Sequence, residues 1–203
     1  LKENPLVNTI SILGTALSIA MIMVLVLVFQ INTAGYPPGS HRSRMLYVGL
    51  TEAVLRSNQC INRGNMSSQV AKECFYTLEK QEAVAVYATD DRPVSLPAKR
   101  LYKEYRIKST NAGFWKVFDF DFLKGYPFTE ADFESALPKA VITSQVAAEF
   151  FGTTDVIGET IIIDFIHYTI TGSVTPKSKA ASHAYAEVWV PYTVNPILMS
   201  PYY

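Results

Sequence analysis

The hydrophobic pattern divides the chain into an apolar N-terminal stretch and a longer region of mixed polarity. No charged side chain occurs between residues 4 and 40, and residues 10–31 (ISILGTALSIAMIMVLVLVFQI) are almost entirely apolar. These twenty-two residues would rise about 33 Å as an α-helix, which is enough to cross a hydrocarbon core of about 30 Å. The pattern therefore predicts a transmembrane helix in an N-terminal segment that covers residues 1–31.

A cleaved secretory signal peptide is the main alternative to a retained helix. The apolar region of a signal peptide runs about 7–15 residues after a basic start. Here the run is longer, and Lys2 stands next to Glu3. The small residues at 33–35 (TAG) still offer a cleavage site, so cleavage stays open as the alternative. A core helix of a soluble protein would need partners that cover every face, and we therefore expect a retained membrane helix.

Small residues gather on one face of this predicted helix. Their spacing of i, i+3, i+4 and i+7 is that of a single helical face, and the residues are Ser11, Gly14, Thr15 and Ser18. Small side chains let membrane helices approach closely, so this face is predicted to pack against another helix. The alternative is that small residues are common in membrane helices and carry no role here. Residues 21–29 are bulky and are expected to face lipid.

The ends of the chain give two further expectations. Lys2 precedes the apolar stretch, whereas Arg42 and Arg44 come after it. The positive-inside rule therefore weakly favours a cytoplasmic location for the region C-terminal to the helix, against the orientation adopted below. The chain begins at Leu1 and stops at Tyr203 within a residue pattern, so we expect a fragment in which the second domain is incomplete.

Residues 32–203 read as one domain that mixes strands with short helices, which is an α+β fold. Strands are predicted at residues 44–50, 83–88, 102–109, 140–142, 160–165, 168–174 and 187–192. Helices are predicted after an N-cap at Ser67 or Ser68, after Thr129, and from Thr143 or Ser144 up to a Gly152 C-cap. Residues 51–65 and 177–183 are expected to be loops, residues 90–93 to break a strand, residues 123–128 to form a turn and residues 166–167 to form a hairpin turn.

Composition excludes several classes of protein. The chain has 203 residues and no net charge, with 49% hydrophobic and only 18% charged residues. A neutral chain without a basic cluster gives no electrostatic basis for nucleic-acid binding, and the apolar content excludes general disorder. Two cysteines are too few for a disulfide scaffold. Cys60 and Cys74 could form a single disulfide in an oxidising compartment, or Cys74 could be a small core residue on the predicted helix.

The search for catalytic chemistry gives one weak candidate. Asp119 and Asp121 stand two residues apart in FDFDF, so in a strand both carboxylates would face the same side and could serve as a general-base or metal-binding pair. The favoured interpretation is a solvated edge whose neighbouring phenylalanines are buried. His41, His167 and His183 lie in predicted turns without metal-ligand spacing. No nucleophile elbow, phosphate loop or dinucleotide motif occurs. We therefore predict no catalytic residue, no metal site and no cofactor.

Four stretches, in order along the chain, carry a family resemblance. They are NP at 4–5 with SILGTA at 11–16; FWKVFDF at 114–120 with FLKG at 122–125; KAVIT at 139–143 with AA at 147–148, FFG at 150–152 and IG at 157–158; and YTITGSV at 168–174. Together they resemble permeases of the MacB/FtsX/LolC type of ABC transporter. Among these, the sequence resembles those of Bacteroidetes members. Trp115 and Ser173 depart from the usual Phe and Val of the pattern.

The resemblance implies a force-transmitting role. A MacB-like periplasmic core domain would follow the first membrane helix, and three further helices, which this chain lacks, would complete the permease. The implied partners are an ABC-type ATPase subunit, a second permease copy, a periplasmic adaptor with an outer-membrane channel, and the lipid bilayer. Family members export peptides, drugs or lipoproteins, and the expected location is the bacterial inner membrane. The alternatives are a membrane-anchored sensor domain and an anchored enzyme built on Asp119 and Asp121.

Overall fold

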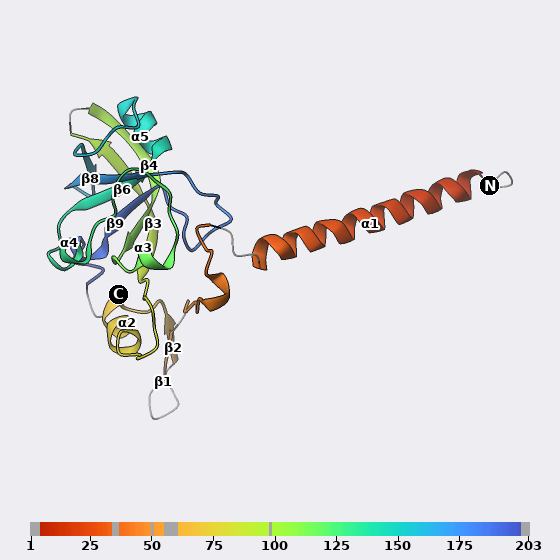
Figure 1. The fold of residues 1–203 in the computed structure, drawn as a ribbon, viewed down its shortest axis with the longest axis horizontal. Coiled ribbons are helices and arrows are strands. Elements are labelled where there is room, and N and C mark those ends of the chain that lie inside the picture. The colour runs from red at the N-terminus through yellow and green to blue at the C-terminus, as the bar shows by residue number, and fades with distance from the viewer. Residues whose placement is uncertain (1–4, 34–36, 50, 55–60, 98, 200–203) are drawn as a thin grey trace. The chain divides into compact units, whose positions relative to one another are not determined.

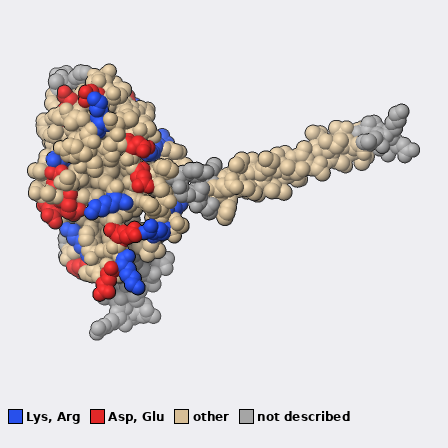
Figure 2. Space-filling view, viewed as in Figure 1, with Lys and Arg blue, Asp and Glu red and all other residues tan. Residues whose placement is uncertain are grey.

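The computed structural model describes residues 5–33, 37–49, 51–54, 61–97 and 99–199, and the chain forms two units, Leu1–Tyr36 and Pro37–Tyr203. The first unit contains helix α1 (Pro5–Thr33), as the apolar pattern predicts. Its stretch Leu6–Gln30 is long and apolar enough to cross a membrane. The helix carries no charged side chain, whereas the visible face of the second unit mixes both signs of charge (Figures 1 and 2).

A sheet that closes on itself forms the centre of the second unit. Its strand order is β5-β8-β6-β9-β4-β3-β7, and β7 also pairs with β8, so that six strands make a ring and β5 extends it. The strands are β3 (Tyr87–Leu96), β4 (Lys99–Thr110), β5 (Phe122–Gly125), β6 (Lys139–Thr143), β7 (Thr160–Ile163), β8 (Ile166–Val174) and β9 (Val188–Pro191). Parallel and antiparallel pairs both occur, which confirms a mixed fold.

Alternating side chains divide the core into two clusters. In β9, Val188 and Val190 join an inner cluster to which all six ring strands contribute, whereas Trp189 joins an outer cluster. The outer cluster contains the aromatic stretch at 114–122, and Trp115 makes ring contacts with several of its members. Because successive residues of a strand face opposite sides, a single strand can contribute to both clusters. The ring is therefore packed with side chains inside and out.

Three short helices begin at the caps that the sequence predicts, and α5 also ends where predicted. Helix α2 (Ser68–Phe75) is capped by Ser67, and α4 (Glu130–Glu134) has a complete capping box in which Thr129 and Asp132 bond each other's backbone. Helix α5 (Ser144–Phe151) begins after the Thr143 cap and ends at Gly152 in the left-handed conformation with φ 72°. Helix α3 (Phe114–Val117) is a single turn within the aromatic stretch. These caps confirm the predicted helix ends.

The region before β3 differs from the prediction. Residues 45–49 form no strand and follow a 3-10 turn (Arg42–Arg44), whereas the predicted loop at 51–65 contains the hairpin strands β1 (Thr51–Val54) and β2 (Ile61–Gly64). Residues 83–86 are irregular, and β3 runs through the predicted break at 90–93. Pro93 is tolerated there because β7 pairs with β3 at Val94 and Ser95, just beyond it.

Four smaller predictions are also wrong. The β7–β8 turn lies at Asp164 and Phe165, both with positive φ, rather than at 166–167. Residues 123–125 of the predicted turn belong to β5, which pairs with β8. The 3–4 spacing predicts that the helix after Ser67 buries Val70, Ala71, Cys74, Phe75 and Leu78, but α2 buries only Ala71. Cys74 is a free and exposed thiol rather than a core residue, and Cys60 lies outside the described residues.

Candidate functional site

The small-residue face of α1 is exposed along its length. Its two hydroxyl-bearing side chains at positions 15 and 18 bond within the helix: Thr15 Oγ1 donates to the Ser11 carbonyl at 3.0 Å, and Ser18 Oγ donates to the Gly14 carbonyl at 2.8 Å. Apart from its chain neighbours and the adjacent helix backbone, no atom lies within 4 Å of the position that a Cβ would take on Gly14. The face therefore presents small side chains whose hydroxyls at these two positions are already bonded, and its role in helix packing remains a prediction.

The two aspartates of FDFDF bind different parts of the chain. Asp119 accepts a hydrogen bond from the Ser40 hydroxyl, and its own N–H donates to the Pro38 carbonyl at 2.9 Å. Asp121 pairs with Lys177, with 2.7 Å between Oδ2 and Nζ. Both carboxylates are exposed and Phe118 is buried, as the favoured interpretation expects, but Phe120 and Phe122 are only half-buried and residues 118–121 do not form a strand. The carboxylates therefore act as separate anchors in the fold.

Histidines and metal-binding groups are sparse. In the described part of the chain, no group of three His, Cys, Asp or Glu residues could hold a metal ion. His41 is exposed in a turn, as predicted, whereas His167 is exposed but lies in β8 rather than in a turn. His183 is instead half-buried, because its ring packs on Tyr47 with 4.3 Å between centroids and its Nδ1 lies 2.7 Å from the Tyr87 hydroxyl.

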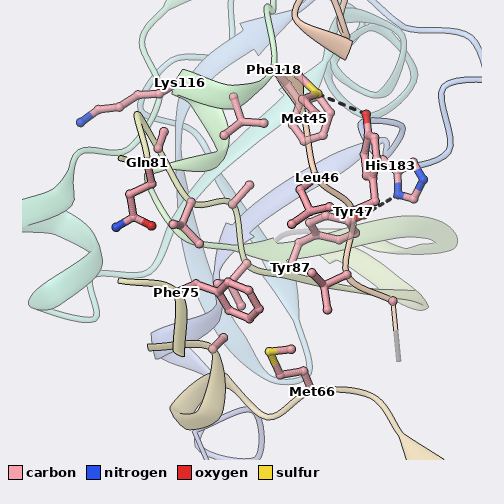
Figure 3. A pocket seen from close by; sticks show the side chains of 18 of the residues that line it. Met45, Leu46, Tyr47, Met66, Phe75, Gln81, Tyr87, Lys116, Phe118 and His183 are labelled. Atoms are coloured by element: carbon pink, nitrogen blue, oxygen red, sulfur yellow. Dashed lines mark hydrogen bonds between the residues drawn. The ribbon is translucent and has the colours of Figure 1, made fainter. Parts of the chain in front are cut away.

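The second unit contains a groove of about 740 Å³. One wall is residues 45–49, and the other is residues 83–90. Phe75 of α2 also lines the groove, and so does Phe118 of the outer cluster, which directly follows α3 (Figure 3). The lining is mostly apolar, with Gln81 and His183 among its polar members. A groove of this size and composition suits a ligand with apolar side groups.

Asn111 holds the second wall in place. Its Nδ2 donates to the Val84 carbonyl at 2.7 Å and to the Tyr76 hydroxyl at 2.7 Å. Its Oδ1 accepts from the Val86 N–H at 3.1 Å, and its own N–H donates to the Val86 carbonyl. This buried side chain thereby replaces the strand partner that residues 84 and 86 would otherwise need.

Lys108 lies buried behind the groove and supports two of its residues. Lys108 stands in the same alternating set of β4 as the exposed Glu104 and Arg106, but its own side chain is fully buried. Its Nζ donates to the His183 carbonyl at 2.5 Å and to the Ser182 carbonyl at 3.2 Å. The same nitrogen lies 4.3 Å from the centre of the Tyr87 ring. Nothing in the sequence pattern distinguishes this lysine from its exposed neighbours on β4.

Burial also changes the ionisation of this cluster. Burial lowers the pKa of Lys108 to about 7, and the nearby Arg106 lowers it further. Burial raises the pKa of Tyr87 to about 12 and lowers that of His183. The described contacts of Lys108 include no carboxylate, so its charged form is stabilised by carbonyl dipoles and ring faces. The cluster is a support for the groove wall, with no substrate-facing amine.

Comparisons with known proteins agree with this architecture. The model of the MacB-like periplasmic core domain matches residues 9–201. The macrolide export ATP-binding/permease protein MacB of Wolinella succinogenes is 23% identical over 199 residues, which cover 96% of this chain and 30% of that protein. The chain thus spans about 30% of the length of this curated relative.

Two solved structures are similar to this chain at low identity. The periplasmic region of MacB from Actinobacillus actinomycetemcomitans matches with a TM-score of 0.51 and 16% identity, over 68% of this chain and 59% of that one. A domain of a putative permease protein from Porphyromonas gingivalis matches with a TM-score of 0.49 and 17% identity, over 74% and 65% of the two chains. Since the family model covers nearly the whole chain, the chain belongs to the MacB-like periplasmic core domain family of ABC transporter permeases.

Proposed function

We propose that this chain is the first membrane helix and periplasmic core of an exporter permease, moved by ATP hydrolysis in a partner subunit. The observation that carries the proposal is the family match over residues 9–201, which includes both the apolar helix and the closed-sheet domain. The substrates that we propose are peptides, drugs or lipoproteins. The proposed location is the bacterial inner membrane, with the domain in the periplasm.

The packing of the second unit supports a mechanical role. The ring of strands is filled by an inner cluster, and α5 contributes Val146, Ala147 and Phe150 to it. Interiors packed in this way have low compressibility and transmit strain. Residues 37–40 are attached to this core through Asp119, so that motion entering at residue 37 would reach the sheet. Such a domain moves as a body and needs no acid–base pair.

The proposed partners agree with this role. An ABC-type ATPase subunit would supply the energy, and a second permease copy would pair with the small-residue face of α1 within the lipid bilayer. A periplasmic adaptor and an outer-membrane channel would receive the substrate. We place Ser11, Gly14, Thr15 and Ser18 at the contact between helices, because close approach requires small side chains.

Paired substitutions in α1 test this proposal. Gly14→Leu with Ser18→Leu should lower dimer formation in liposomes, measured by energy transfer between labelled copies, by about tenfold, and lower the ATPase rate of the co-purified complex in parallel. Val24→Leu is the matched control, since Val24 lies in the bulky half of the exposed helix. It should leave both measurements unchanged.

The two parts of the proposal can fail separately. If no ATP-binding subunit co-purifies with the native protein from membranes, the transporter role is contradicted. If the subunit co-purifies but the Gly14 and Ser18 variants behave like the Val24 control, only the packing face is contradicted.

A further inference from the structure

The segment that joins β8 to β9, residues 175–187, is a strap that the rest of the fold holds at both ends. At one end the Thr175 N–H donates to the Asp121 carbonyl at 3.1 Å, and at the other the Glu187 N–H donates to the Arg106 carbonyl at 2.9 Å. The strap contains no helix or strand, and residues 176, 178–180 and 182 are exposed. Segments with few buried contacts open locally at a lower free energy than the whole domain.

The middle of the strap is held by the side chain of Lys108 in β4. The Nζ atom donates to the carbonyls of Ser182 and His183, at 3.2 and 2.5 Å. The rings of Tyr87 and Phe114 form other sides of this site, with centres 4.3 and 5.9 Å from the same nitrogen. The two carbonyl bonds exist only while the strap lies on β4, and an opened strap would leave the amine to water.

The charged groups around Lys108 favour its neutral form. Arg106, on the same strand, adds a second positive charge and takes up the carboxylates next to it. Asp91 accepts from the Arg106 guanidinium at 2.9 and 2.8 Å, and Glu187 accepts from the Arg106 N–H at 2.9 Å. Lys179 of the strap also acts on Asp91. Burial, together with Arg106, therefore lowers the pKa of Lys108 to about 7, from an ordinary value of 10.5.

His183 adds a second ionisable group to the closed strap. Its Nδ1 lies 2.7 Å from the Tyr87 hydroxyl, and its ring packs on Tyr47 (Figure 3). The raised pKa of Tyr87 keeps that hydroxyl protonated, so the hydroxyl can donate to the neutral imidazole. Burial lowers the pKa of His183, and the positive charges of Lys108 and Arg42 lower it further. Protonation of this ring is therefore also less favourable while the strap is closed.

We propose that the strap is a pH-operated latch, which is closed on β4 while Lys108 and His183 are neutral and is opened by acidification. Both side chains bind protons more tightly in water than beneath the closed strap, so a lower pH favours the open form. Opening withdraws His183 from the groove wall and uncovers the ring faces of Tyr87 and Phe114, while the ends of the strap stay bonded. The proposal concerns the strap alone and does not depend on the proposed transport function.

Hydrogen exchange of the native protein, expressed from its full reading frame and held in detergent micelles, tests the latch. The amides to follow are those of Ala184 and Tyr185, which both donate to the Ala181 carbonyl, at 2.9 and 2.7 Å. Their protection, corrected for the intrinsic pH dependence of exchange, should be about 15-fold lower at pH 7 than at pH 8.5, because the amine beneath the strap takes up a proton on opening. The amide of the buried Ile170, which donates to the Glu159 carbonyl at 2.8 Å, reports opening of the ring of strands. It should stay at least about tenfold better protected than the strap at both pH values.

Substitutions of Lys108 should act in opposite directions. Lys108→Met carries no charge, so the strap should stay closed, with protection that changes less than about twofold between pH 7 and pH 8.5. Lys108→Arg stays charged over this range, so the strap should be poorly protected at both pH values. Lys177→Met is the matched control, because it removes a bond from the strap to Asp121 but leaves Lys108 in place. It should lower the protection by the same factor at both pH values. His183→Gln should abolish only the further loss of protection below about pH 6.5.

Three outcomes overturn the proposal. Equal protection of the strap amides at the two pH values in the native protein shows that the strap does not respond to acidification. Equal protection of Ala184 and Ile170 shows that the strap opens only when the whole domain unfolds. An unchanged pH dependence in Lys108→Met assigns the effect to another group and removes this amine from the latch.

Discussion

At the scale of single residues, Lys108 is the side chain whose environment departs furthest from what its type suggests. A buried lysine usually has a carboxylate partner, but the contacts described for Lys108 are two backbone carbonyls and the rings of Tyr87 and Phe114. These contacts fix the loop that carries His183 against β4. Burial makes the protonated form of Lys108 less favourable in the folded protein than in the unfolded chain, and this lowers the free energy of unfolding wherever the unfolded chain is protonated.

This cost predicts how stability changes with pH. The pKa of Lys108 is about 7 in the folded protein and 10.5 as its ordinary value, so the unfolded chain binds more protons between these two pH values. The free energy of unfolding should therefore rise with pH in this window, at a rate up to about 1.4 kcal/mol per pH unit from this group. Measured by urea unfolding, the native protein should gain roughly 1–3 kcal/mol relative to Lys108→Met between about pH 7 and pH 9.

Lys116→Met is the matched control, because Lys116 is exposed. Its difference from the native protein should stay constant over the same pH range. Parallel pH profiles for the native protein and Lys108→Met would contradict the assignment of a lowered pKa to this amine.

At the scale of elements, the β7–β8 hairpin carries a turn whose second residue, Phe165, does not suit its conformation. Asp164 has φ 48° and Phe165 has φ 66°, in a two-residue loop between paired Ile163 and Ile166. Such loops favour Asn or Asp followed by Gly. Phe165 is 97% exposed, so it gains no packing in return for this conformation.

Phe165→Gly should therefore stabilise the domain. Glycine removes the strain of the left-handed conformation, and we expect the free energy of unfolding to rise by about 1 kcal/mol in urea titrations. Tyr102→Gly serves as control, because Tyr102 is also well exposed but lies inside β4, where glycine should lower the free energy of unfolding. A loss of stability in Phe165→Gly would show that the aromatic ring makes a contact that the structure does not contain.

The same turn shows where sequence patterns succeed and where they stop. Thr143 and Gly152 mark the ends of α5 correctly because caps depend on local hydrogen bonds and on the freedom of glycine. The position of the β7–β8 turn was not predictable, since no Gly or Asn marks residues 164–165. Pairing partners decide the rest: β3 continues through Pro93 because β4 lies beside it, and residues 45–49 remain unpaired despite a strand-like pattern.

The candidate site was harder to predict than the fold. The fate of Asp119 could be read from local composition, because alternation with phenylalanines indicates a solvated edge. The burial of Lys108 and the role of Asn111 instead depend on which distant segments pack against β4 and its end, namely the loop at His183 and the segment at Val84. Contacts between residues 25 or more positions apart leave no periodic trace in one sequence.

At the scale of the whole molecule, the question is how motion of the membrane helix would reach the sheet. The second unit begins at residue 37, and its first residues are attached to the core by the Pro38 carbonyl and by the Ser40 hydroxyl, both bonded to Asp119. His41 also lies 4.0 Å from the same carboxylate. Asp119, through its backbone N–H and its carboxylate, therefore offers a route by which force entering at this segment would pass to the outer cluster.

Substitution of Asp119 separates force transmission from stability. Asp119→Ala removes the acceptor for Ser40, and both side chains are accessible to water, so the free energy of unfolding should fall by no more than about 1 kcal/mol. The amides of residues 40–42 should nevertheless exchange several-fold faster, and ATP-driven export by the assembled complex should fall in parallel. Asp119→Asn keeps an acceptor oxygen and should retain most of both properties.

Asp121→Ala completes the comparison, because this neighbour bonds Lys177 instead of the entering segment. It should leave both the exchange of residues 40–42 and the export rate close to native. If Asp119→Ala loosens residues 40–42 without lowering export, motion enters the domain by another route. If Asp121→Ala lowers export as strongly as Asp119→Ala, the effect belongs to the charge of the FDFDF tract rather than to the bond with Ser40.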